Sequence, residues 1–511
     1  MIPQDNSQDF FPQDVSADHP NCPSIAYFKI FLERFAIKEL IEKHLTDPRK
    51  KEGDYSFCTL IKTVLANCLF LCGSQNSFQT TARKTGEQEN NVAHFIGSEN
   101  EKIPDPKTID TVMRGLDYEG CNDILMDLFE KVRESKLFFN HPELIPDGEY
   151  HLGCDAETIH TYKPGCDHDC ENCPYCLKRT RDKTVWYNHT VLVGSLVSPG
   201  GFKLPIYVHP IKAEAVREKE SASDNEHKQE CELSAFKVVA RIIRERFPKL
   251  RICMLLDSLY ANGPNIRLLN EINFNYFIVR KDGSMPTVGE DCDGLMKLPD
   301  HVENNHVFER FHDGKGNIIE KKYDFFNDIA YQDVKVHIIR FQEKRINSKL
   351  NKIETTYWEW ISGEKITKKN VAKLSARARV RWEEEDQFNT AECRGFNMRH
   401  DYSRNPTAQM AWVVFLNLAI GLEHLFIYTT TSVRLRSKMS IRDYMADLFH
   451  EIRFICKSKI DSMVYSLGNI QFRFSPIRKM KTWIKFNNNY NLILINLMKN
   501  QLKKKMMYLK Y

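Results

Sequence analysis

The chain has 511 residues and a net charge of +5, and 42% of its residues are hydrophobic while 28% are charged. This balance is typical of a soluble globular protein of two to four domains, and it excludes a disordered chain and a largely membrane-embedded one. The 15 cysteines are an odd number, mostly scattered over apolar stretches, which favours a reducing cytoplasm over a disulfide framework.

The N-terminal part of the chain is expected to be helical. Residues 1–24 are polar and predict a loose N-terminus without the order of a signal peptide. In residues 25–147 apolar side chains recur every three or four positions, which predicts an all-helical N-terminal domain. The segment SFQTTARKTG within it could open a helix-turn-helix.

From residue 148 the pattern changes to apolar strands, with Gly200 and Gly201 as a hairpin turn, and strands then alternate with helices. This predicts an α/β domain over 148–430, a mixed sheet flanked by helices. Residues 284–365 are expected to be a β-rich insertion, and helices return from about residue 370. The apolar run 410–428 contains Asn417, Glu423 and His424, so we expect a buried core helix rather than a membrane span.

Basic charge collects in the C-terminal segment 431–511, which holds 17 Lys or Arg against 4 Asp or Glu. Such a segment could follow a phosphate backbone. Residues 471–511, however, contain no Ala, Asp, Glu, Gly or Val, the amino acids whose codons begin with G. A frameshifted or read-through tail of AT-rich sequence would have this composition, and we favour that interpretation slightly.

Two aspartates end strand-like runs and are candidate metal ligands. Asp155 closes HLGCD, and Asp257 closes RICMLLD. Carboxylates at strand ends suit Mg²⁺ or Mn²⁺, because hard divalent cations favour oxygen ligands. Glu157 shares the strand face with Asp155 and is a rival candidate for the metal site. Glu271, on a later helix, is a weaker candidate, because its position is typical of a solvated surface residue.

A third carboxylate, Glu385, is selected by helical phase. At about 100° per residue, Glu385 falls on the apolar stripe of its helix, whereas Glu383 and Glu384 point away. An acid on a core-facing stripe should bind a metal ion or pair with a cation, since burying an unpaired charge is costly. Arg381 could neutralise Glu385 or contact a phosphate. The stripe consists of Val371, Leu374, Ala378, Trp382 and Phe388.

These motifs, in this order, resemble the DDE transposases of bacterial insertion sequences, specifically those with a β-strand insertion before the catalytic glutamate. The strand ending GCDAET matches the first aspartate, and LLDSLYAN, a strand running into a helix, matches the second. The family pattern R-W-x-I-E-x-x-F is matched by Arg381, Trp382, Glu385 and Phe388. The resemblance covers roughly residues 100–430.

The resemblance implies a ribonuclease H-like fold in which Asp155, Asp257 and Glu385 hold two Mg²⁺ or Mn²⁺ ions. It implies a DNA transposase, with metal-dependent endonuclease cleavage and strand transfer of a mobile element by in-line attack. The partners would be double-stranded DNA, at transposon ends and target, and a second copy when assembled on DNA. The helical N-terminal domain would take the place of an end-binding domain, in a bacterial cytoplasm at the nucleoid.

Three positions depart from the family pattern. Ala378 stands in place of a tyrosine, Glu384 in place of an isoleucine and Glu392 in place of a lysine. An acid at position 392 would repel DNA rather than hold a phosphate. Two alternatives therefore stay open: an inactive or repurposed transposase-derived DNA-binding zinc protein, and a ribonuclease H-like nuclease without strand transfer.

A dense cysteine cluster lies in the segment 163–183, which predicts a metal-binding knuckle. Structural Zn²⁺ is the first expectation, followed by an iron–sulfur cluster and then by redox cysteines without metal. One ligand could come from His160 or His189, although an ordinary strand role is favoured for these two. The expected ligands are Cys166, Cys170, Cys173, Cys176 and His168.

Basic residues near both candidate sites are expected to contact DNA. Lys178 and Arg179 flank the cysteine knuckle, and Arg381 lies near Glu385. Arg394, Arg399, His400 and Arg404 follow the glutamate helix, with ordinary solvated charge as the competing explanation.

Overall fold

The centre of the structure is a sheet of 10 strands in the order β2-β3-β1-β5-β6-β10-β9-β8-β7, with β4 also paired to β3. This computed structural model describes residues 23–51, 53–181, 183–212, 224–314, 316–347, 352–383, 391–392, 395–429, 439–467, 472 and 474. The strands are β1 (Tyr150–Tyr162), β2 (Cys176–Arg181), β3 (Thr184–Val197), β4 (Lys203–Pro210), β5 (Ile252–Leu256), β6 (Asn275–Val279), β7 (His306–His312), β8 (Ile318–Tyr331), β9 (Val334–Asn347) and β10 (Lys352–Ser362).

The sheet is mixed and flanked by helices, as predicted. β1 pairs antiparallel with β3, and β3 pairs antiparallel with β4. The β3–β4 turn contains Gly200 and Gly201, whose φ angles of 96° and 87° suit glycine. β1, β5 and β6 are parallel neighbours, and their connections contain the helices α9 (Asp224–Arg246) and α10 (Gly263–Glu271). A parallel pair needs such crossovers.

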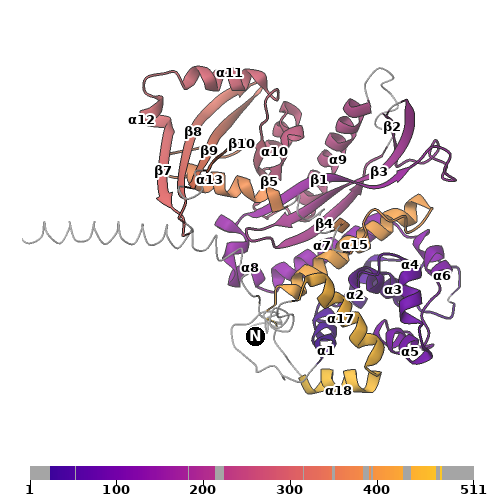
Figure 1. Ribbon diagram of the computed structural model, residues 1–511. Coiled ribbons are helices and arrows are strands. Elements are labelled where there is room, and N and C mark those ends of the chain that lie inside the picture. Colours follow the sequence, from indigo (N-terminus) through magenta and orange to yellow (C-terminus); the bar gives the residue numbers. More distant parts are fainter. Residues whose placement is uncertain are drawn as a thin grey trace, which may run out of the picture.

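The predicted insertion continues the central sheet rather than forming a separate one. β10 pairs antiparallel with β6, so that Trp360 lies opposite Val279, and β9, β8 and β7 follow in order. The segment is not purely β-rich, because α11 (Pro286–Leu295) and α12 (His301–Asn305) precede β7. Figure 1 shows these strands and helices at the opposite end of the molecule from the N-terminal helices.

The N-terminal helices pack with two helices from the C-terminal part of the chain, α17 (Ile441–Phe454) and α18 (Lys457–Leu467). α17 packs on α5 and α18 on α1 (Figure 1). The N-terminal helices are α1 (Ser24–Arg34), α2 (Ile37–His44), α3 (Phe57–Leu69), α4 (Gln75–Ala82), α5 (Gly86–Phe95), α6 (Pro106–Met113), α7 (Tyr118–Glu134) and α8 (Leu137–Asn140), followed by the short turns η1 (Pro142–Leu144) and η2 (Pro146–Gly148).

The segment SFQTTARKTG spans α4 and the turn before α5. Ser74 accepts a hydrogen bond from the backbone of Ser77, and Thr85 accepts one from the backbone of Gln88. These side chains cap the first turns of the two helices.

Of the segment 471–511, expected to be a frameshifted or read-through tail, only Phe472 and Phe474 are described, both buried, and residues 475–511 lie outside the described part.

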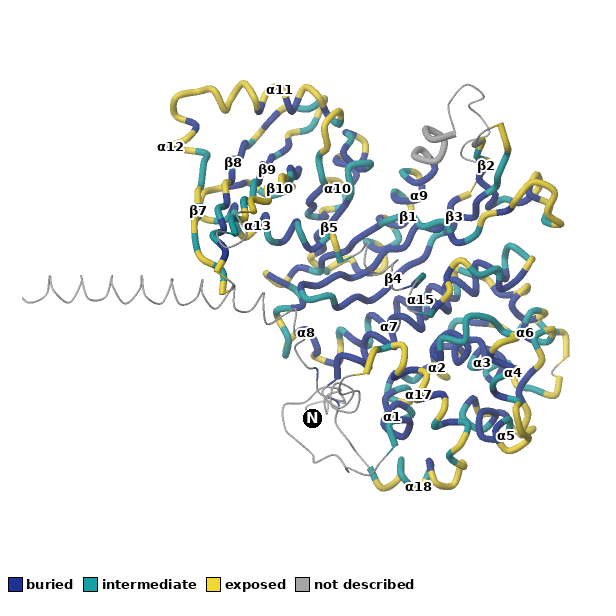
Figure 2. The backbone as a smooth tube through the Cα atoms, in the orientation of Figure 1, coloured by how far each residue is buried: buried dark blue, intermediate teal, exposed yellow. Residues whose placement is uncertain are grey.

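The apolar run near the C-terminal end of the fold is a core helix, as predicted. α15 (Pro406–Ile427) is long and apolar enough to cross a membrane, but its most apolar window is fully buried within the structure. It packs against β4, α3 and α7. Figure 2 shows buried residues running from the central strands through α15, while α11 is largely exposed.

Asn122 joins α7 to the sheet edge. Its side-chain amide donates to the backbone oxygen of Val208 on β4 at 2.9 Å and accepts from the backbone nitrogen of Val208 at 2.8 Å. The Asn122 side chain is fully buried. A buried backbone group without a partner is destabilising, so this one residue substitutes for a neighbouring strand.

We expect Asn122→Ala to lower the free energy of unfolding by about 3 kcal/mol, because two buried backbone groups of Val208 lose their partners. The measurement is the shift in the urea denaturation midpoint. The exposed Asn304 of α12 supplies the control, since Asn304→Ala should leave the midpoint unchanged. Equal midpoints for the two variants would contradict the role of Asn122.

Candidate functional site

Four side chains from the cysteine-rich segment and β3 converge on one point. The donor atoms of His168, Cys173, Cys176 and His189 all lie within 4.8 Å of one another. His189 Nε2 is 3.3 Å from Cys173 Sγ and 3.2 Å from Cys176 Sγ. Two sulfurs and two imidazole nitrogens at this spacing could bind a metal ion such as zinc.

The strand register explains this convergence. Cys176 opens β2 and lies directly opposite His189 on β3. Cys173 is brought back by a turn in which the Cys176 backbone nitrogen donates to the Cys173 carbonyl oxygen at 3.4 Å. The His168 ring stacks on Tyr162 of β1, with ring centres 4.1 Å apart. Three strands therefore fix the four donors.

The electrostatics of the cluster also suit a metal ion. Cys173, Cys176 and His189 are buried. A hydrogen bond from the Cys176 thiol, together with nearby His189, lowers the pKa of Cys173 and favours its thiolate, while the same hydrogen bond raises the pKa of Cys176. His168 Nε2 is buried and has no hydrogen-bond partner among the described residues, which leaves its lone pair available.

This donor set differs in part from the sequence-based expectation. His168, Cys173 and Cys176 were expected ligands, whereas Cys166 and Cys170 lie outside the group of four, with their sulfurs 3.9 Å apart. His189, for which an ordinary strand role was favoured, belongs to the group. The other named histidine, His160, instead places Nδ1 3.4 Å from the carbonyl oxygen of Arg399.

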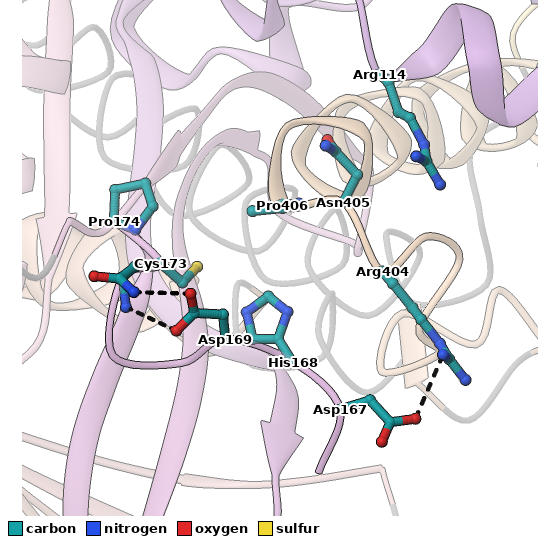
Figure 3. Close-up of a pocket in the computed structure, with 10 residues that line it drawn as sticks. Arg114, Asp167, His168, Asp169, Cys173, Pro174, Arg404, Asn405 and Pro406 are labelled. Atoms are coloured by element: carbon teal, nitrogen blue, oxygen red, sulfur yellow. Dashed lines mark hydrogen bonds and ion pairs between the residues drawn. The ribbon is translucent and has the colours of Figure 1, made fainter.

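A cavity of about 410 Å³ lies beside the cluster. Figure 3 shows His168 and Cys173 on one side of it, and Arg404 and Arg114 on the other, where α15 begins. Arg404 is paired with Asp167 at 3.5 Å, so the knuckle touches the chain that leads into α15.

The two aspartates expected to bind metal belong to neighbouring parallel strands, but only Asp257 follows a strand end. The prediction that Asp155 closes its strand is wrong, because β1 continues to Tyr162 through its antiparallel pairing with β3. β1 and β5 pair with Gly153 opposite Leu255, an offset of 102 residues. Asp155 and Asp257 are also 102 residues apart. The observed pairing ends two residues before the aspartates. If its register extended to them, the two side chains would lie on the same face, since side chains directly opposite each other share a face of the sheet.

The turn after β5 is fastened to α9. Asp257 accepts a hydrogen bond from the Leu259 backbone at 2.8 Å, and the Tyr260 hydroxyl donates to Glu232 on α9 at 3.0 Å. Burial, and the negative charges of Glu232, Asp155 and Asp257, raise the pKa of Tyr260 well above its usual range. Glu232 was not foreseen, because nothing in its local sequence marks it as a neighbour of the strand ends.

The helix expected to carry the third acid is interrupted before it reaches the acids at 383–386, and residues 382–383 are helical again. α13 (Val371–Ala378) gives way to a 3-10 turn, η5 (Arg379–Arg381). A 3-10 turn advances about 120° per residue instead of 100°, which adds about 60° over three residues. Val371, Leu374 and Ala378 are buried as predicted, but Trp382 is 57% exposed. Helical phase therefore cannot select an acid beyond the turn.

Glu385 itself lies outside the described residues, as do Glu384, Phe388 and Arg394. The described chain stops at Glu383 and resumes at Ala391. A side-chain oxygen of Glu383 approaches Gly201 in the β3–β4 turn, within 3.2 Å of the position that a Cβ would occupy.

Arg399, expected to contact DNA, is engaged within the protein. Its guanidinium pairs with Glu157 at 2.8 Å and with Glu392 at 2.5 Å. Burial and the adjacent Glu157 carboxylate raise the pKa of Glu392. The acid at position 392 is therefore neutralised in place rather than presented alone to a phosphate.

The remaining predicted contact residues are dispersed. Lys178 is exposed and Arg179 half-buried on β2 at the sheet edge. Arg381 is half-buried on η5, and burial lowers the pKa of His400. The rival acid Glu271 is exposed on α10, with Arg241 3.8 Å away.

Comparison with known proteins adds no family assignment. No protein-family model matches the sequence, and no curated protein matches it.

For the metal cluster, we expect Co²⁺ to bind the full-length protein with the absorption of a tetrahedral site that has two sulfur ligands. Replacing His189 or Cys173 with alanine should abolish this spectrum, because each removes a donor. Cys166→Ala is the matched control, since Cys166 lies outside the group of four. Loss of the spectrum in the control, with retention in His189→Ala, would contradict this donor set.

Proposed function

We propose that the protein is a DDE-type DNA transposase that cuts and joins DNA by metal-dependent phosphoryl transfer. Asp155, Asp257 and Glu385 would hold two Mg²⁺ or Mn²⁺ ions, with double-stranded DNA as the substrate. The domain over residues 148–430 would be a ribonuclease H-like catalytic domain interrupted by the β7–β10 insertion.

One observation carries this proposal: Asp155 and Asp257 are 102 residues apart, the same offset as the β1–β5 register, whose last pair, Gly153 with Leu255, lies two residues before them. Two carboxylates that a shared register would bring close together repel each other unless a cation lies between them. A pair of carboxylates on one strand face is the ligand arrangement that hard divalent ions require.

The strand connections support the ribonuclease H-like assignment. β1 pairs antiparallel with β3, and β3 pairs antiparallel with β4. Helix α9 then leads to β5, which lies beside β1, and helix α10 leads from β5 to β6. The catalytic aspartates of such a domain are expected on the first and fourth of these strands. Asp155 lies on β1 and Asp257 directly follows β5, which supports the proposal.

The chain's own residues would position the reaction rather than form a covalent intermediate. The bound ions would activate the attacking oxygen and stabilise the leaving oxygen. Asp155 and Asp257 would orient them, and the Tyr260–Glu232 hydrogen bond holds the turn that presents Asp257. No side-chain nucleophile is required for in-line attack.

Zn²⁺ is the metal that we assign to the second cluster, in a structural role. Two cysteines and two histidines fill a tetrahedral site and leave no position for substrate. The ion would tie the knuckle to β3, the neighbour of the strand that carries Asp155. The adjoining Lys178 would then lie on a rigid edge suited to a DNA backbone.

The test is nicking of supercoiled DNA, and of DNA that carries the element's ends, by full-length protein with Mn²⁺. We expect Asp155→Asn and Asp257→Asn each to reduce the rate by roughly 10³-fold or more, because each removes a metal ligand needed for charge stabilisation.

Glu271→Gln is the control, since Glu271 is an exposed acid of the same domain and should leave nicking unchanged. Full activity in Asp257→Asn would refute the carboxylate mechanism. Nicking without end joining would instead identify a nuclease of this fold.

A further inference from the structure

One face of β1 carries acids and a histidine on both sides of Asp155. β1 pairs with β3 without a register shift from Leu152 to Thr158, so alternate residues share a face. His151, Asp155 and Glu157 are on this face, and Glu149 immediately precedes the strand in the same phase. On this face Glu149 and His151, before Asp155, and Glu157, after it, are contacted by arginines from the chain that follows β10.

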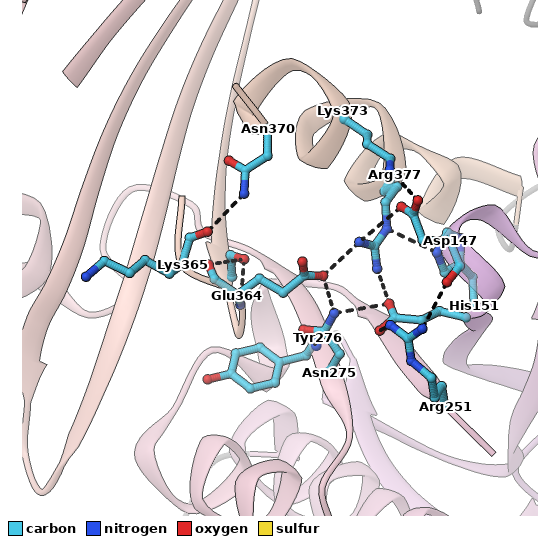
Figure 4. Close-up of polar contacts among 12 residues, drawn as sticks. Asp147, His151, Arg251, Asn275, Tyr276, Glu364, Lys365, Asn370, Lys373 and Arg377 are labelled. Atoms are coloured by element: carbon cyan, nitrogen blue, oxygen red, sulfur yellow. Dashed lines mark hydrogen bonds and ion pairs between the residues drawn. The ribbon is translucent and has the colours of Figure 1, made fainter. Parts of the chain in front are cut away.

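The first contact is made by Arg377 of α13, which is 4% exposed. Its guanidinium pairs with Glu149, donates to Glu364 at 2.7 Å and donates from Nε to His151 Nε2 at 3.3 Å. Figure 4 shows Arg377 reaching down from α13 between Glu364, His151 and Asp147. One side chain thus links α13, β1 and the end of β10.

The network is chemically consistent. Burial, and then the positive charge of Arg377, lower the pKa of His151 to about 3, so the ring is neutral and Nε2 can accept the hydrogen bond. The donors of Glu149, His151 and Cys253 also converge, but the guanidinium already pairs with the first two, so this group is not a metal site. Arg377 further lies over the Phe277 ring, 5.3 Å from its centre.

The second contact is made by Arg399, on the other side of Asp155. It joins Glu157 of β1 to Glu392, at 2.8 Å and 2.5 Å. The chain that leaves α13 is therefore held against β1 before Asp155 by Arg377, and again after Asp155 by Arg399. Both contacts lie on the face that presents Asp155.

Buried ion pairs are a poor source of stability, because desolvating the charges offsets their attraction. Their better-supported role is to specify one geometry. Apolar contacts already hold α13 on the sheet through Val371, Leu374 and Ala378. What apolar packing leaves undetermined is the lateral position of the helix relative to β1, and the buried contacts of Arg377 fix it. The pair of Arg399 with Glu157 is more exposed, and it joins the later chain to β1.

We propose that Arg377 and Arg399 are positioning residues for the carboxylate site, which set the chain following β10 against β1 on either side of Asp155. This inference rests on the proposed function for its catalytic consequence. It also explains the acid at position 392, which serves as a partner for Arg399 rather than as a phosphate contact.

The experiment compares Arg377→Lys and Arg399→Gln with Arg251→Lys in the full-length protein. Arg251 is the matched control because it pairs with the same Glu149 carboxylate at 3.1 Å, yet is 66% exposed and does not reach α13. Two readouts are needed: hydrogen exchange of residues 371–378 and of β1, and the Mn²⁺ concentration that gives half-maximal nicking.

We expect both test variants to need roughly tenfold more Mn²⁺, since small errors in placement are costly, while the control stays within about twofold of wild type. Exchange should rise in α13 for Arg377→Lys and around Glu157 in β1 for Arg399→Gln. Adding Glu392→Lys to Arg399→Gln should restore the Mn²⁺ requirement, because a lysine can pair with Glu157 directly.

Unchanged Mn²⁺ dependence in both test variants would overturn the positioning role, even if the thermal midpoint falls, because a merely structural pair affects stability alone. A failure of Glu392→Lys to rescue would overturn the role of Arg399. If the wild-type protein does not nick DNA, the proposed function falls and the catalytic role of both arginines falls with it. Hydrogen exchange distinguishes failure of the proposed function from failure of the positioning role, since it reports the contacts of Arg377 and Arg399 whether or not the protein nicks DNA.

Discussion

The parallel pairing of β1 with β5 is the constraint on which the rest of the structure depends. It sets the 102-residue offset that Asp155 and Asp257 share, and it requires the crossover α9, whose Glu232 holds the turn after β5. The other neighbour of β1 is β3, which carries His189 to the metal cluster. Asp155 on β1 and His189 on β3 are thus on adjacent strands, so the β1–β3 pairing sets the position of one candidate site relative to the other.

The sequence was most informative where one residue could be assigned from its neighbours. Apolar runs identified the start of β1 and the whole of β5, although β1 continues past Asp155 to Tyr162. The glycine pair identified the β3–β4 turn, and the polar residues of 410–428 indicated a core helix rather than a membrane span. These features depend on local patterning, which a single chain displays directly.

Features set by distant partners could not be predicted. His189 joins the cysteines only through the β2–β3 register, and the partners of Arg377 lie up to 228 residues away. The helical stripe failed beyond Ala378 because a 3-10 turn changed the rotation per residue, which sequence periodicity does not reveal. Glu392 shows the same limitation, since its meaning depends on Arg399 and Glu157.

The position of His189 has a consequence for the order of folding. Cys173 and Cys176 are close in sequence, but their fourth partner arrives only when β3 has paired with β2. A metal ion could be held loosely by the knuckle alone, yet would be retained tightly only after the hairpin forms. Tight metal retention would therefore distinguish the chains in which β3, the strand next to β1, has already paired.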